Sequence, residues 1–183
     1  MKDSISVIKT IKNGRIGVLP TDTIYGLVGS ALSPKTVERI YHLRKRNPKK
    51  PMIILIGSIN DLAKFKIAID QKTKRMLNRF WPGKVSIILP CLSRKFEYLH
   101  RGTKTLAFRI PADDLRKLLS KTGPLVAPSA NPEAKKPAET IKEAKKYFGS
   151  VRRLRPEENK VDFYHDAGNL KSKPSTVISI ENC

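Results

Sequence analysis

Hydroxyl, carboxylate and cationic side chains gather where apolar stretches of the chain end, a pattern that suits the binding of an anionic ligand. The first cluster, Pro20-Thr-Asp-Thr-Ile-Tyr-Gly26, directly follows the apolar segment Arg15–Leu19, which reads as a strand. Open α/β sheets bind their ligands in loops at strand ends. An ordinary turn, capped by its own Asp and Thr side chains, is the alternative. Two threonines around one aspartate exceed the needs of a turn, so we favour a binding loop.

A turn rich in cations comes next along the chain. Arg44-Lys-Arg-Asn-Pro-Lys-Lys50 holds five positive charges in seven residues, between an expected helix and the expected strand Met52–Ile56. Cations at a helix C-terminus complement the helix dipole, which explains some of these charges but not all of them. Pro48 and Pro51 stiffen the turn. The arrangement predicts a phosphate-binding rim.

Further polar side chains adjoin three later strands. Ser129 and Asn131 lie in Pro128-Ser-Ala-Asn-Pro132, where alternation along an extended segment places both on one side. They can hold triphosphate oxygens or an adenine ring, and a Ser/Asn turn before a proline is the alternative. Arg109 ends another strand and can grip a carboxylate with two donors. Ser175, in Pro174-Ser-Thr-Val177, adds a hydroxyl. Together these residues predict a pocket for an anionic ligand.

The overall charge agrees with an anionic ligand but does not establish one. The 183 residues include 37 Lys and Arg against 16 Asp and Glu, a net charge of +21. Such an excess attracts nucleic acid and nucleotide phosphates. A lysine-rich proteome would give the same excess on every surface, so only the local arrangement of the cations distinguishes the two cases.

Composition excludes several other classes of protein. The length and the 39% hydrophobic content indicate one domain with its own core. The longest apolar runs, Met52–Ile56 and Val85–Leu89, fall far short of the ~20 residues of a membrane span, and no leader opens the chain. We therefore expect a cytoplasmic protein. Cys91 and Cys183 have no partner pattern, so we expect no structural metal.

Two common kinds of catalytic site are not indicated by the sequence. No GxGxxG motif follows a strand, so a dinucleotide fingerprint is missing. His42, His100 and His165 are scattered, and none stands near a Ser or Cys in a nucleophile context. We therefore do not expect a mechanism that depends on histidine.

Helical and strand patterns alternate along the chain, which predicts an α/β domain with helices packed on a sheet. The expected helices are Asp3–Lys12, a helix after the N-cap Ser33 that carries Val37, Ile40, Tyr41 and Arg44 on one face, one that begins at Ser58, Asp70–Phe80, Asp113–Lys121 and Glu139–Phe148. The expected strands are Arg15–Leu19, Met52–Ile56, Val85–Leu89, Thr105–Ile110, Leu125–Ala127, Val161–Tyr164 and Thr176–Ile180. The polar segment Gly149–Lys160 reads as a long mobile loop.

The polar clusters belong to a longer series of motifs. In chain order these are Pro20-Thr-Asp-Thr-Ile-Tyr-Gly-Leu27, Arg44-Lys-Arg46 with Lys50-Pro-Met-Ile53, Trp81-Pro-Gly83, Arg109-Ile-Pro111, Ser129-Ala-Asn131 and Pro174-Ser-Thr-Val177. In residues and spacing the series resembles the YrdC domain of the threonylcarbamoyl-adenylate synthases, over nearly the whole chain.

The resemblance implies a single YrdC-like domain over residues 1–183, with a twisted mixed sheet and flanking helices around an open concave pocket. It implies a nucleotidyltransferase that joins L-threonine, bicarbonate and ATP into threonylcarbamoyl-AMP and releases pyrophosphate. The product is the precursor for N6-threonylcarbamoyladenosine at tRNA position 37. The implied partners are therefore the tRNA threonylcarbamoyl transferase machinery and tRNA itself, with no membrane. Mg²⁺ would be carried by the ATP phosphates rather than by a protein metal site.

The resemblance also implies roles for individual residues. On the threonine side, Thr23 and Ser175 would be hydroxyl partners and Arg109 would clamp the carboxylate, while Leu55 and Ala127 would line the pocket. The implied ATP contacts are Arg44, Arg46, Lys50, Thr105, Ser129 and Asn131, of which Arg44, Arg46, Ser129 and Asn131 are the candidate catalytic residues. Three positions depart from the usual residue of the family: Arg44 replaces a lysine, Leu55 a histidine and Ser86 a threonine.

Two other functions compete with this interpretation. The first is a basic module that binds double-stranded RNA or tRNA without catalysis. Such a module predicts aromatic stacking platforms among the basic residues, and no aromatic residue lies between Tyr41 and Phe65. The second is the carbamoyl-adenylate step of hydrogenase maturation, whose related domain belongs to much longer chains. The chain ends six residues after Val177 without an arginine-bearing tail, so we expect a short, stand-alone form.

Overall fold

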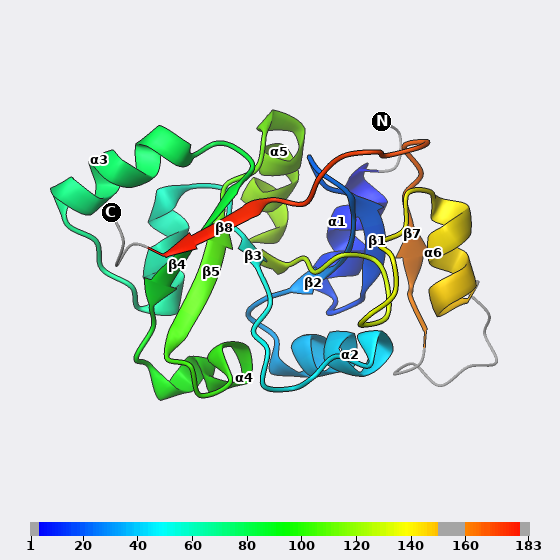
Figure 1. Ribbon diagram of the computed structural model, residues 1–183, viewed down its shortest axis with the longest axis horizontal. Helices are drawn as coiled ribbons and strands as arrows, with labels where there is room; N and C mark the ends of the chain where they lie inside the picture. The colour runs from blue at the N-terminus through cyan, green and yellow to red at the C-terminus, as the bar shows by residue number, and fades with distance from the viewer. Residues whose placement is uncertain (1–3, 150–159, 180–183) are drawn as a thin grey trace.

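The computed structural model describes residues 4–149 and 160–179, and within them the strands form one mixed sheet. Its strands are β1 (Gly17–Pro20), β2 (Tyr25–Ser30), β3 (Ile54–Leu55), β4 (Val85–Pro90), β5 (Thr105–Arg109), β6 (Leu125–Val126), β7 (Phe163–Tyr164) and β8 (Thr176–Ser179). Across the sheet they lie in the order β7-β1-β2-β6-β3-β5-β4-β8, drawn in Figure 1. The two strands nearest the C-terminus thus form opposite edges of the sheet.

Helices cover both faces of this sheet. They are α1 (Ser4–Lys12), α2 (Pro34–Arg44), α3 (Gln71–Phe80), α4 (Glu97–His100), α5 (Asp113–Thr122) and α6 (Ile141–Phe148), with the 3-10 helices η1 (Ile59–Phe65) and η2 (Arg94–Phe96). Helices α1 and α5 lie side by side in Figure 1 and share one core cluster, to which they contribute Ile11, Leu115 and Leu119. The other helices pack on the opposite face around a larger cluster. This arrangement confirms the predicted α/β class.

The larger core is centred on aromatic rings from three different elements. Phe65, at the end of η1, lies 5.3 Å from the ring of Phe96 and 5.0 Å from the ring of Phe108 in β5. All three side chains are fully or almost fully buried. Offset aromatic contacts of this kind add to the free energy that burial already supplies. They fix η1 and η2 against the strand that ends at Arg109.

Local capping explains why the predicted helices begin where they do. Ser33 accepts a hydrogen bond from the Thr36 N–H at the start of α2, and Asp70 does the same for the Thr73 N–H of α3. The expected start at Ser58 is also confirmed, with a capping box between Ser58 and Asp61, although the element is a 3-10 helix. These caps satisfy backbone donors that the first helical turn leaves free.

The sequence did not predict the strand β2, nor the short helices η2 and α4. Tyr25–Ser30 contains two glycines in six residues, and glycine lowers the strand signal because it contributes no side chain to the pattern. The expected loop Gly149–Lys160 falls largely outside the described residues, so the structure does not test it. Among the described helices, none has the length and apolar character to span a membrane.

The cap of α2 gives a first testable expectation. Ser33→Ala removes the acceptor of the Thr36 N–H and should lower the free energy of unfolding by about 0.5–2 kcal/mol. Ser93 is a matched control, because it occupies the N-cap of η2 without a side-chain cap bond. Urea unfolding should show a change of less than about 0.5 kcal/mol for Ser93→Ala. Equal losses in the two variants would contradict the assignment of the cap.

Candidate functional site

Arg44 is the last residue of α2, and its side chain points into the protein rather than into solvent. It is only 3% exposed. Its Nε donates to the Asn131 carbonyl at 2.9 Å and its Nη2 donates to Ser129 Oγ at 3.2 Å. Lys45 adopts a left-handed conformation (φ 48°), which ends the helix and turns the chain away. The structure thus brings together three predicted site residues from two distant motifs.

The buried guanidinium remains a cation at neutral pH. Burial, and then the nearby charge of Arg46, lower the pKa of Arg44 to about 10. Its Nη1 is buried and has no hydrogen-bond partner among the described residues. A buried donor without a partner costs free energy, and an anionic ligand atom is one group that would relieve that cost.

Asn131 holds the loop that follows β6 in a fixed shape. Its Nδ2 donates to the carbonyls of Pro132 at 2.9 Å and Lys135 at 2.6 Å, and the residue is buried. Arg44 therefore contacts the hydroxyl of Ser129, which is half-buried, but only the backbone carbonyl of Asn131. The Asn131 side chain serves the loop that positions Ser129 beside Arg44.

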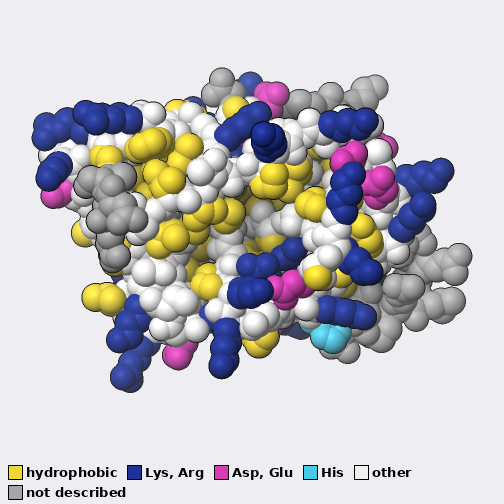
Figure 2. Space-filling view, viewed as in Figure 1, with side chains coloured by type: hydrophobic (Ala, Val, Ile, Leu, Met, Phe, Trp, Pro, Cys, Tyr) yellow, Lys and Arg dark blue, Asp and Glu magenta, His cyan; other side chains and the backbone are white. Residues whose placement is uncertain are grey.

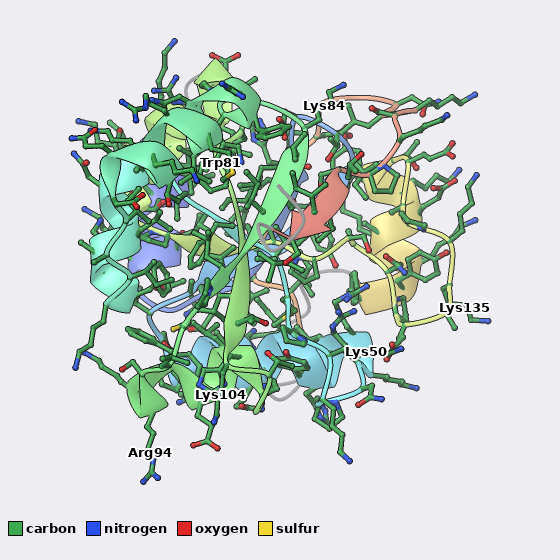
Figure 3. The ribbon with its side chains drawn as sticks, turned by 60° about the vertical axis from the view of Figure 1, so that its left-hand side comes forward. Lys50, Trp81, Lys84, Arg94, Lys104 and Lys135 are labelled. Carbon is green, nitrogen blue, oxygen red and sulfur yellow. The ribbon has the colours of Figure 1, made fainter. Side chains whose placement is uncertain are left out.

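Arg46, one of the predicted ATP contacts, stabilises the basic turn after α2. Arg46 donates from Nε to the Lys50 carbonyl at 3.1 Å and from Nη2 to the Pro51 carbonyl at 2.8 Å. The Tyr41 hydroxyl also donates to the Lys50 carbonyl, at 2.9 Å. These bonds fix the backbone of the turn. The Lys50 side chain is more than half exposed and lies beside α2 in Figure 3.

Arg109 is engaged by a carboxylate of the chain itself. Its Nη1 donates to Asp22 in the loop between β1 and β2, and Asp22 also accepts from the Ala112 N–H at 3.3 Å. Both side chains are largely buried. The guanidinium predicted to clamp the threonine carboxylate therefore already has an acidic partner. Its Nε is buried and has no hydrogen-bond acceptor among the described residues.

Hydroxyl groups lie near this ion pair. Ser175 and Ser86 are hydrogen-bonded through their hydroxyls at 2.9 Å. In the antiparallel pair β4–β5, Ile87 lies opposite Phe108, so Ser86 and Arg109 are the next neighbours across the same ladder. The hydroxyl of Thr23 lies 3.1 Å from that of Thr21, and both threonines are buried.

The turn Trp81–Gly83 secures the start of β4 beside the end of β5. The Gly83 N–H donates to the Ile110 carbonyl at 2.9 Å, and Trp81 Nε1 donates to the Val85 carbonyl at 2.7 Å. A Cβ at Gly83 would lie 2.6 Å from the Phe80 carbonyl oxygen, so a side chain does not fit here. Figure 3 shows Lys84, at this end of the β4–β5 pair, far from Lys104 at the other end.

Gly26 joins the two groups of polar residues. It forms a β-bridge with Ser129, and the neighbouring Leu27 N–H donates to the Pro128 carbonyl at 2.9 Å. A Cβ at Gly26 would lie 2.9 Å from Thr21 Cγ2, so glycine allows the loops to approach. Figure 2 shows this face of the molecule hollowed above α2, with hydrophobic side chains around the hollow and Lys and Arg side chains below it.

Two residues predicted to line the threonine pocket adjoin these groups but lie in the core. Leu55 is paired with Arg109 in the parallel ladder of β3 and β5. Leu55 has no exposed surface and packs with Leu115, Leu119 and Leu125, so in this conformation it offers no surface to a ligand. Ala127 is partly buried and packs against the same cluster, with its N–H bonded to the Ile53 carbonyl at 3.0 Å.

Thr105 stands at the opposite end of β5 from Arg109. Its hydroxyl hydrogen-bonds to that of Thr103 at 3.2 Å. The adjoining helix α4 contacts α2, where the Arg101 guanidinium stacks over the Tyr41 ring at 4.0 Å. Thr105 therefore lies on the α2 side of the molecule, the side of the basic turn, without a contact that ties it to Arg44.

Two acidic residues are important to the site in ways that the sequence reasoning missed. Asp22 was noted only as part of its motif, and its partner Arg109 is 87 residues away. Glu133 was not singled out, yet it binds the basic turn through Lys50 and Asn47. The available signal was the scarcity of acids, because a carboxylate inside a motif of so basic a chain needs a reason.

The fold and the site define an α/β domain whose loops bring cations and hydroxyls together. The chain belongs to the Sua5, YciO and YrdC family, whose sequence model, described as telomere recombination, matches residues 9–183. It is 31% identical over 144 residues to the threonylcarbamoyl-AMP synthase of Pyrococcus abyssi, covering 77% of this chain and 42% of that protein. It is 28% identical over 142 residues to the threonylcarbamoyl-AMP synthase of Halorhodospira halophila, covering 76% of this chain and 74% of that protein.

A solved structure agrees with these relatives. The crystal structure of P. abyssi Sua5 complexed with L-threonine superposes with a TM-score of 0.80 at 29% identity, over 98% of this chain and 51% of that one. The chain thus spans about half the length of the Pyrococcus protein. These comparisons confirm the predicted YrdC-like fold and place the chain in a family of nucleotidyl-transferring enzymes.

The position of Leu55 gives a second testable expectation. Leu55→Ala removes a fully buried side chain and should lower the free energy of unfolding by about 2–5 kcal/mol. Leu92, which is 76% exposed, is the control, and Leu92→Ala should change stability by less than about 0.5 kcal/mol in the same urea titration. A small loss for Leu55→Ala together with weakened threonine binding would instead make Leu55 a lining residue.

Proposed function

We propose that this chain joins L-threonine, bicarbonate and ATP into threonylcarbamoyl-AMP and releases pyrophosphate. The observation that carries the proposal is the Arg44 guanidinium, which is buried and bonded to Ser129 Oγ and the Asn131 carbonyl. This side chain connects the motif of the basic turn with the Ser129–Asn131 motif. Its Nη1 is a donor without a hydrogen-bond partner among the described residues. The names of the synthase relatives support the same reaction.

The nucleotide side of the proposed site consists of the basic turn and the loop after β6. Arg44 and Lys50 supply charge to the phosphates, and Ser129 supplies a hydroxyl close to Arg44. Arg46 adds charge and also holds the turn through two backbone carbonyls. Fixed cations of this kind stabilise the charge that develops on phosphate oxygens during displacement.

The threonine side consists of Arg109 with the hydroxyls of Thr23 and Ser175. Arg109 can hold a carboxylate only while it shares its donors with Asp22, or after Asp22 has moved. The Ser175 hydroxyl is hydrogen-bonded to Ser86, the neighbour of Arg109 across the β4–β5 ladder. The L-threonine bound to the Pyrococcus relative supports this choice of substrate.

The proposed reaction needs no nucleophile from the protein. Bicarbonate loses water to give carbon dioxide, which the threonine amine attacks with loss of a proton to give a carbamate. A carbamate oxygen then attacks the α-phosphorus of ATP, and the bond from that phosphorus to the bridging oxygen breaks and releases pyrophosphate. The work of the protein is then positioning and charge neutralisation, for which Arg, Lys, Ser and Thr side chains suffice. Mg²⁺ enters on the ATP phosphates as part of the substrate.

The product is an activated carbamate, so a transfer reaction must consume it. We infer that it passes in the cytoplasm to the machinery that modifies tRNA, which would place the threonylcarbamoyl group on adenosine. The net charge of +21 favours contact of this chain with tRNA during that step.

The substrate requirement tests the proposal. Pyrophosphate release from ATP should need threonine and bicarbonate together, because their carbamate is the attacking group. Serine should replace threonine with a loss of about 1–3 kcal/mol in kcat/KM, the worth of one methyl group in an apolar niche. A pyrophosphate assay with each component omitted in turn makes the comparison. Equal release without threonine or without bicarbonate would contradict the reaction.

Arg46→Ala distinguishes a basic turn that holds the triphosphate from a basic turn that binds only RNA. If the turn holds the triphosphate, the variant should lose pyrophosphate release at least tenfold with no RNA present, because the phosphates lose a nearby cation. Arg94, which Figure 3 shows at the periphery, is the control, and Arg94→Ala should keep full release.

If the basic turn binds only RNA, the same pair of variants gives another result. Arg46→Ala would then keep full pyrophosphate release, and its main effect would be to reduce the slope of RNA affinity against salt concentration by about one. Filter binding at several salt concentrations measures that slope. This outcome would remove the basic turn from the enzyme site.

A further inference from the structure

The carboxylate of Glu133 contacts the basic turn through both of its oxygens. Its Oε1 accepts from Lys50 Nζ at 2.9 Å, and its Oε2 accepts from the Asn47 N–H at 2.5 Å. The Glu133 N–H in turn donates to the Arg44 carbonyl at 2.8 Å. Glu133 lies two residues after Asn131, so the loop that carries Ser129 also carries an anion into the predicted phosphate-binding rim.

The donors around this carboxylate are of the kind that bind a phosphate oxygen. One is an ammonium group and the other is a backbone N–H at the start of a turn, where Asn47 Oδ1 accepts from the Lys49 N–H and the Asn47 carbonyl accepts from the Lys50 N–H. Ammonium groups and backbone amides together form common anion sites. The turn therefore has the form of an anion site, and Glu133 fills it.

The contact is not one on which the fold depends. The Lys50 side chain is 61% exposed and that of Glu133 is 27% exposed. Ion pairs with so much exposure contribute little to stability. The bond from Asn47 and the Lys50 charge hold the pKa of Glu133 below its usual value, so the carboxylate is ionised at neutral pH.

We propose that Glu133 sets the affinity for ATP, because its carboxylate competes with the triphosphate for Lys50 and for the Asn47 N–H. The inference rests on the proposed function of the basic turn. Nucleotide binding must first break the contacts of Glu133, and the displaced carboxylate then lies close to phosphates of the same charge. Both carboxylate oxygens already accept from the turn, which favours a competing anion over a ligand for the metal of ATP.

Glu133→Gln tests the competition directly. The amide oxygen can still accept from the Asn47 N–H, but the charge that holds Lys50 is gone. Titration calorimetry should give a dissociation constant for Mg-ATP about two- to fivefold lower than that of the wild type, as the modest worth of an exposed ion pair allows. Inorganic tripolyphosphate, which lacks the nucleoside, should show the same gain.

Glu139→Gln is the matched control for the change in total charge. Glu139 is 28% exposed and pairs with Lys136 at 2.7 Å, so the variant removes a carboxylate of similar exposure that is also paired with a lysine, elsewhere on the protein. Its dissociation constant should equal that of the wild type. In a Lys50→Ala background, Glu133→Gln should lower the dissociation constant for Mg-ATP much less, because the cation for which the Glu133 carboxylate competes is missing.

The outcomes separate this inference from the function on which it rests. If Lys50→Ala weakens ATP binding while Glu133→Gln binds ATP as the wild type does, the inference about Glu133 is wrong. The proposal that the basic turn binds ATP is then unaffected. Equal gains for Glu133→Gln and Glu139→Gln, or weaker binding by Glu133→Gln, would also overturn it. If Lys50→Ala binds ATP as the wild type does, or the wild type binds none, the assignment of the turn to ATP fails first.

Discussion

The buried guanidinium of Arg44 is the interaction on which the nucleotide side of the structure depends. A charge that leaves water is costly unless hydrogen bonds surround it, and here a carbonyl and a hydroxyl from one loop supply them. The end of α2, the turn that follows it and the loop after β6 are therefore fixed relative to one another. These contacts are made by the protein itself, so the three segments are arranged without the help of a ligand.

Acidic residues keep the other cations of the site in place. Asp22 holds Arg109 and Glu133 holds Lys50, although the chain has fewer than half as many acids as bases. Without such partners, closely spaced cations would repel one another and swing into solvent. In the proposed function, an anion that binds here has to replace each of these partners. The two carboxylates would thus lower the affinity of the site for its ligand.

The sequence predicted what depends on neighbouring residues and missed what depends on distant ones. Ser33 and Asp70 cap their helices through donors three residues away, so short motifs sufficed. The strand β2 was not predicted because its two glycines weaken the hydrophobic pattern of a strand. Motif resemblance selected Arg44, Ser129 and Asn131, which the structure brings together. The pairing of Lys50 with Glu133 spans 83 residues, and no local pattern encodes it.

The two halves of the proposed site are close enough to act on one extended molecule. Thr23 belongs to the threonine side, and Gly26, three residues later, pairs with Ser129 of the nucleotide side. Three residues of extended chain span at most about 10 Å. Side chains and a carbamate can bridge that gap, so the proposed bond between the carbamate oxygen and the α-phosphorus would form beside Gly26. The close contact of Gly26 with Thr21 and Pro128 then has a chemical reason, because a bulkier residue would push apart the two loops that hold the reacting groups.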